Sequence, residues 1–140
     1  MTDQAARASS AFQDVLSDFA PVREAVLDAR LTDLASAVAE DAARIGRASE
    51  WSDGQVETML LRANGSTRRF DVGESIGSGE LKAGIASYLQ DEVVDQLGEP
   101  WPVIDMDGHA HVLEPRVLRD GTGAWCSGET AYRPIGELWR

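Results

Sequence analysis

The sequence has few of the features that assign a protein to a class at first sight. Its 140 residues include one cysteine, Cys126, so an internal disulfide is excluded and a reducing compartment is expected. No apolar run approaches the ~20 residues that a membrane-spanning helix needs. The first residues, MTDQAARASSAFQ, lack the basic and then apolar order of a signal peptide. We therefore expect a cytoplasmic protein with no membrane partner.

Recognisable catalytic motifs are also missing. The sequence contains no nucleophile elbow, no Ser-His-Asp order and no dinucleotide fingerprint. The glycine-rich stretch GESIGSG, residues 73–79, lacks the lysine of a phosphate-binding P-loop. A flexible turn before a helix explains this stretch better. We expect the protein not to be an enzyme.

Basic residues are scarce beside acidic ones. The chain has 13 Lys and Arg against 24 Asp and Glu, for a net charge of −11 that is spread along its length. An acidic coat repels the phosphates of nucleic acids and anionic lipids, so neither is expected as a partner. The charge suits a basic protein partner or mimicry of a nucleic acid, but solubility alone is the simpler explanation.

The N-terminal third predicts helix over residues 4–48. The apolar residues of a first helix recur at helical spacing: Phe12, Val15, Leu16 and Phe19. Pro21 interrupts this pattern and favours the start of a second helix, whose apolar stripe continues to Ile45. Because this second helix is rich in alanine, it suits packing within the chain or against a second copy, and a homodimer stays open.

A β-hairpin is predicted over residues 56–72, VETMLLRANGSTRRFDV. Asn64-Gly65 between two strand-like runs is the favoured two-residue turn, because both central residues need positive φ. The resulting register pairs Met59 with Phe70 on the face that we expect to be buried. The next helix is predicted to start with Ser78 as its N-cap and to bury one stripe: Leu81, Ile85, Leu89 and Val93.

The remainder of the chain predicts strands, a turn at RDGTG and an irregular tail that ends in IGELW. The fold class is therefore α+β, with an N-terminal helical pair, a central β-hairpin, one helix and a C-terminal β-hairpin. A small, mostly antiparallel sheet is expected. Residues 1–140 are interpreted as a single domain, in which a helical part (1–50) precedes a ββαββ-like part (51–140).

The segment WPVIDMDGHAHVLEP, residues 101–115, contains both histidines of the chain. In one extended strand Asp105, Asp107, His109 and His111 lie on the same face, because alternate side chains point the same way. The two histidines lie about 6.7 Å apart at Cα and can share one ion. All four side chains converge only if the intervening glycine bends the chain.

These residue types make the segment a candidate metal site. Imidazole, thiolate and carboxylate groups are the usual ligands of zinc, and the candidate ligands are His109, His111, Cys126 and Asp107. The alternative assigns no chemistry to the segment, since alternating polar residues are what the outer side of a half-buried strand needs. Between these alternatives the polar strand is favoured, so no cofactor is expected, with zinc as the exception to test.

Four short motifs together resemble a group of small uncharacterised actinobacterial proteins. The motifs are the Trp-Pro pair at 101, HAHVLEP, the Trp-Cys pair at 125 and IGEL, and the resemblance covers about residues 85–138. The pattern of that group, W-P-x-C-P, H-x-H-P-L-x-P, W-x-C-P and I-G-x-L, implies a small Cys/His zinc ribbon. In this sequence Ile104 and Asp105 replace the first Cys-Pro, and Ser127 stands where the second cysteine is expected. The resemblance therefore implies either a weakened site or a packed hairpin with Trp101 and Trp125 beneath it.

Size, acidity and the lack of catalytic motifs together favour one function. We expect a non-enzymatic module that binds another protein, as a chaperone, inhibitor or adaptor. The alternative is a zinc ribbon-like protein with its site around His109, His111 and Cys126. Mimicry of a nucleic acid is a third hypothesis, for which no single residue argues.

Overall fold

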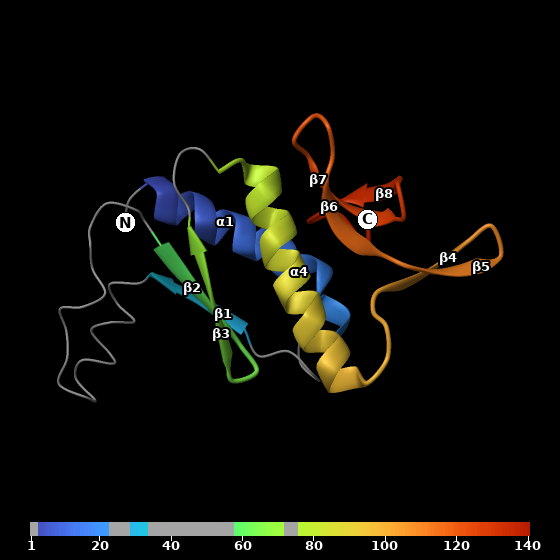
Figure 1. Ribbon diagram of the computed structural model, residues 1–140, viewed down its shortest axis with the longest axis horizontal. Coiled ribbons are helices and arrows are strands. Elements are labelled where there is room, and N and C mark those ends of the chain that lie inside the picture. Colours follow the sequence, from blue (N-terminus) through green and yellow to red (C-terminus); the bar gives the residue numbers. More distant parts are fainter. Residues whose placement is uncertain (1–2, 23–28, 34–57, 72–75) are drawn as a thin grey trace.

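Two helices form the centre of the protein, α1 (Asp3–Asp18) and α4 (Ser78–Leu97), and they pack against each other (Figure 1). The structure is a computed structural model, and it describes the following residues: 3–22, 29–33, 58–71 and 76–140. Within these ranges no helix is long and apolar enough to cross a membrane. A three-stranded sheet lies on each side of the helix pair, so the α+β class is confirmed.

Helix α1 forms as its apolar spacing predicts. The residues of the predicted apolar stripe are all buried in the core, with Phe19 directly after the end of the helix: Phe12, Val15, Leu16 and Phe19. The expected second helix is wrong over residues 29–33, which form strand β1 (Ala29–Asp33). Here the chain pairs with β2, and its backbone groups form hydrogen bonds across the sheet. The spacing of apolar residues in so short a segment does not predict such pairing with a distant strand. The rest of the predicted second helix beyond residue 22 lies outside the described residues.

The first sheet contains the predicted hairpin, β2 (Thr58–Ala63) and β3 (Ser66–Asp71), with β1 added at the edge of β2. The register is confirmed, since Met59 pairs with Phe70 across the strands. Asn64 and Gly65 take positive φ values of 52° and 86° at the turn. Met59 is buried and Phe70 packs against the core, as predicted for this face.

Helix α4 buries the predicted stripe and ends at a glycine. Leu81, Ile85, Leu89 and Val93 are all buried, and Gly98 terminates the helix in a left-handed conformation with its N–H donating to the Val94 carbonyl (2.8 Å). The predicted N-cap is wrong by one residue. Gly77 occupies that position and no side chain caps the helix.

The C-terminal part contains more strands than predicted. The strands are β4 (Val103–Met106), β5 (His109–Val112), β6 (Glu114–Val117), β7 (Gly123–Ser127) and β8 (Thr130–Pro134). The strands β4 and β5 form a separate hairpin that extends away from the helices, and β6, β7 and β8 form a three-stranded sheet against α4 (Figure 1). The expected irregular tail is therefore wrong, because residues 130–134 pair with β7.

The aromatic core lies between α1 and the C-terminal sheet. Trp125 is fully buried and Trp101 is half-buried, which confirms the prediction that Trp125 is a core residue. Phe19 lies 4.9 Å from Trp101 and 5.9 Å from Trp125 between ring centroids. These tilted contacts bring the end of α1, the entry to β4 and the middle of β7 together, and so fix the base of the β4–β5 hairpin.

Candidate functional site

The histidine segment is a hairpin and not a single strand. Asp107 and Gly108 reverse the chain with φ values of 55° and 78°, the positive values that a two-residue type I′ turn requires. The register pairs His109 with Met106 and His111 with Ile104, while Asp105 pairs with Ala110 on the opposite face. The predicted common face of two aspartates and two histidines is therefore wrong.

The four candidate metal ligands occupy different surroundings. His109 is exposed and Asp107 lies in the exposed turn. The His111 Nδ1 atom lies 2.8 Å from the Ser127 hydroxyl, with which it forms a hydrogen bond. Cys126 is buried in β7, and burial raises the pKa of its thiol above the ordinary value. This shift favours the neutral thiol over the thiolate that binds zinc.

The geometry does not bring these ligands together. In the part of the chain that the structure describes, no three His, Cys, Asp or Glu side chains form a group that could hold a metal ion. A zinc ion at this segment would have to recruit ligands through a rearrangement of the hairpin or from other residues. The zinc site stays a prediction.

The base of the hairpin is held by a buried amide. The Nε2 atom of Gln90, on α4, donates to the carbonyl oxygens of Trp101 (2.9 Å) and Leu113 (2.6 Å). The Leu113 N–H also donates to the Pro102 carbonyl (3.0 Å), which extends the ladder below β4 and β5. Gln90 is buried, and its hydrogen bond to Leu113 is formed away from solvent. The hairpin thus projects from a base fixed on α4.

One face of this projecting hairpin is open and partly apolar. Val103 pairs with Val112 across the strands, and their exposed fractions are 47% and 44%. Ala110 and Asp105 form the next pair on the same face and are also exposed. Within the described residues the hairpin is a sheet of two strands, with no third strand beside it. An unsupported pair of strands is marginally stable in water, so this face is suited to being covered.

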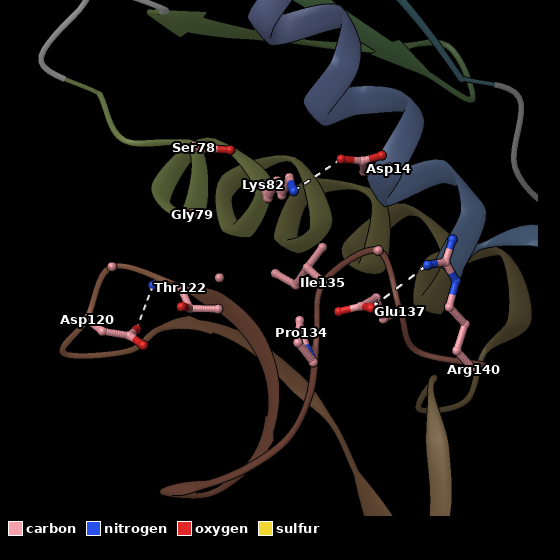
Figure 2. A pocket seen from close by; sticks show the side chains of 13 residues that line it. Asp14, Ser78, Gly79, Lys82, Asp120, Thr122, Pro134, Ile135, Glu137 and Arg140 are labelled. Atoms are coloured by element: carbon pink, nitrogen blue, oxygen red, sulfur yellow. Dashed lines mark hydrogen bonds and ion pairs between the residues drawn. The ribbon is translucent and has the colours of Figure 1, made fainter.

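A second feature is a polar pocket of about 490 Å³ between the start of α4, the β6–β7 turn and the C-terminal segment (Figure 2). Lys82 lies 3.1 Å from Asp14, and Arg140 lies 3.8 Å from Glu137, at its border. Both cations in the lining are therefore within ion-pair distance of a carboxylate. None of the four candidate metal ligands lines the pocket.

A carboxylate in the turn beside the pocket is also engaged. The backbone N–H of Thr122 donates to the Asp120 side chain (2.9 Å), and this hydrogen bond lowers the pKa of the carboxyl group. The interaction forms within the turn and stabilises its conformation. Each charged side chain that lines the pocket in the described part of the chain thus already has a partner there: Asp14, Lys82, Asp120, Glu137 and Arg140.

A cluster of hydroxyl and carboxyl groups links the first sheet to α4. The Ser66 hydroxyl donates to the Glu92 carboxylate (2.7 Å) and also lies 3.0 Å from the Ala63 carbonyl. It is hydrogen-bonded to the Tyr88 hydroxyl as well. A serine hydroxyl has one proton and two lone pairs, so these contacts use its hydrogen-bonding capacity. The cluster is a structural link.

Sequence reasoning missed the residues that shape the hairpin. Asp107-Gly108 is an Asp-Gly pair between strand-forming residues, the same signal that identified the turn at Asn64-Gly65. The exposed valines carried no signal, because an apolar residue in a strand is usually buried. Comparison of the chain with protein-family models, curated proteins and solved structures found no match in any of the three.

Proposed function

We propose that this protein is a non-enzymatic protein-binding module whose β4–β5 hairpin contacts the partner. The single observation that carries the proposal is the open face of the hairpin, where Val103 and Val112 are paired and about half exposed. Single exposed apolar residues are normal on protein surfaces. A β-branched pair on an isolated two-stranded sheet is different, because sheets gain stability when such a face is covered.

The rigid base of the hairpin supports the same proposal. Gln90 fixes the strands on α4, and the His111–Ser127 hydrogen bond joins β5 to β7. A fixed element loses little conformational entropy when it binds. The hairpin is thus suited to recognition as a preformed surface.

The test compares what three forms of the protein retain from a lysate of the source organism. In the double variant Val103→Thr/Val112→Thr the strand propensity and the side-chain shape are kept while the apolar surface is reduced. The matched control is Val117→Thr on β6, outside the hairpin, where the exposed fraction is also 44%. Retained proteins are quantified by mass spectrometry.

We expect the wild type and Val117→Thr to retain the same protein in stoichiometric amount. The double variant should retain about ten-fold less of it, because each substitution removes one buried methyl group, which contributes about 0.8 kcal/mol, and about 1.4 kcal/mol corresponds to ten-fold in affinity. Equal retention by all three forms would contradict the proposal, and so would the absence of any stoichiometric partner.

A further inference from the structure

Lys and Arg are absent from the stretch that contains the hairpin, although the net negative charge of the chain is spread over its length. Between Lys82 and Arg116 the sequence has no Lys or Arg, and it has seven acidic residues: Asp91, Glu92, Asp95, Glu99, Asp105, Asp107 and Glu114. This stretch consists of most of α4, the loop after it and the β4–β5 hairpin. All seven except Glu92 are exposed.

The cations that border this stretch do not neutralise the hairpin. Lys82 forms its ion pair with Asp14 on α1, and Arg116 lies 3.8 Å from Glu114 at the base of β6. Asp105 and Asp107 form no ion pair within the described residues. Asp105 belongs to the open face with the two valines, and Asp107 lies in the turn at the tip of the hairpin. The apolar face is therefore bordered by unneutralised negative charge.

We infer that the occupant of the open face is an extended segment of another protein that carries Lys or Arg together with apolar residues. This inference rests on the proposed function and adds the chemistry of the partner. Apolar side chains of such a segment cover Val103 and Val112, while its cations approach Asp105 and Asp107. Each strand of a two-stranded sheet also has one unpaired edge, where an extended segment can add backbone hydrogen bonds.

The negative charge around the open face also argues against a second copy of the chain or a nucleic acid as its occupant. A second copy of the chain would bring the same acidic residues to the contact, and like charges that face each other in an interface are unfavourable. A nucleic acid would be repelled for the same reason. A basic segment is attracted, and complementary charge raises the association rate as well as selecting the partner.

The defined probe is a library of random peptides about ten residues long, the upper end of ordinary strand lengths. Peptides are selected on the immobilised full-length protein, and binders to Val103→Thr/Val112→Thr are discarded. We expect the enriched peptides to have net positive charge and apolar residues at alternate positions. Their binding should weaken when NaCl is raised from about 0.05 M to about 0.5 M, because salt screens exposed charges.

Charge variants of the protein then test the aspartates. Asp105→Asn/Asp107→Asn keeps the turn, since Asn-Gly is also favoured there, and it should weaken an enriched peptide by about two- to five-fold per removed charge. The matched control is Glu129→Gln, at an exposed residue in the turn between β7 and β8, and it should leave binding unchanged.

The outcomes separate the two proposals. Neutral or acidic peptides that still require the two valines would overturn the basic-partner inference and leave the protein-binding function standing. The same conclusion would follow from basic peptides whose affinity is unaffected by both salt and Asp105→Asn/Asp107→Asn. If no peptide distinguishes the wild type from Val103→Thr/Val112→Thr, the hairpin is not the binding surface, and both proposals fail.

Discussion

At the scale of single residues, one buried carboxyl group connects α1 to β7 and to the C-terminal segment. Asp18, at the end of α1, is 1% exposed. Its side chain accepts hydrogen bonds from the Trp125 indole (2.8 Å) and from the backbone N–H groups of Gly136 (2.6 Å) and Leu138 (3.0 Å). The Trp139 indole also donates to the Asp18 carbonyl (2.7 Å). The C-terminal segment is thus held in place by groups of one residue, whose importance no local sequence pattern indicates.

This arrangement predicts that Asp18→Ala is severely destabilising. The substitution leaves three donors without their acceptor, and since an unsatisfied buried donor costs about 1–3 kcal/mol, the loss should be at least about 3 kcal/mol. Urea unfolding followed by tryptophan fluorescence measures the loss. The control is Asp14→Ala, one turn earlier on the same helix, which removes the Lys82 ion pair near the surface and should cost at most about 1 kcal/mol. Equal unfolding free energies for the two variants would contradict the prediction.

At the scale of elements, short-range turn signals predict structure well, and pairing between distant elements cannot be predicted from them. Asn64-Gly65 identified the first hairpin and its register, because the turn geometry itself fixes which residues face each other. The Asp107-Gly108 pair carries the same information, which the interpretation of the histidine segment as one extended strand does not use. Strand β1 had no such signal. It depends on pairing with β2, which follows it after a long separation in the sequence.

The contact between α4 and the C-terminal sheet depends on Gly79. A Cβ atom added to Gly79 would overlap the carbonyl oxygen of Gly121 and lie 2.7 Å from the Gly123 nitrogen. Neither neighbour is a flexible side chain, so the backbone of the helix or of the β6–β7 turn would have to move. The first turn of α4 therefore packs directly on backbone, an approach that only glycine permits.

We predict that Gly79→Ala destabilises the protein by about 3 kcal/mol or more, at or above the upper end of ordinary overpacking costs. The control is Gly77→Ser, two residues earlier, where φ is −71° and an added Cβ would lie 3.9 Å from the Glu80 carboxylate. This change supplies a preferred N-cap and should alter stability by only a few tenths of a kcal/mol. Thermal and urea unfolding measure both variants, and a Gly79→Ala protein as stable as wild type would show that the contact can relax.

At the scale of the whole molecule, the sequence predicts the local elements and part of the core but not the candidate binding surface. The apolar stripes of α1 and α4 and the buried face of the first hairpin follow from periodicity. No sequence pattern predicts the exposure of Val103 and Val112, because it depends on the tertiary arrangement, in which no described strand lies beside β4 and β5. The candidate surface thus results from the tertiary arrangement, and its two valines are of a residue type that is usually buried in a core.

This arrangement divides the described chain into a tightly packed centre and a projecting arm. In the centre, Leu89 and Val93 of α4 are fully buried, and β7 is covered by strands on both sides. In the arm, β4 and β5 pair only with each other and are fixed mainly at the base. Local opening of the arm therefore breaks few buried contacts, whereas opening of the centre requires global unfolding.

Native-state hydrogen exchange should resolve these two parts. We predict that amides near the Asp107-Gly108 turn exchange about ten-fold or more faster than those of α4 and β7, a gap of at least about 1.4 kcal/mol. Protection should rise from the turn toward Leu113, whose N–H is bonded at the base. Ser127→Ala removes the hydrogen bond to His111 and should speed exchange in the arm while α4 is unaffected. If the arm exchanges as slowly as β7 in the free protein, the arm does not open locally, and the division into a packed centre and an opening arm is wrong.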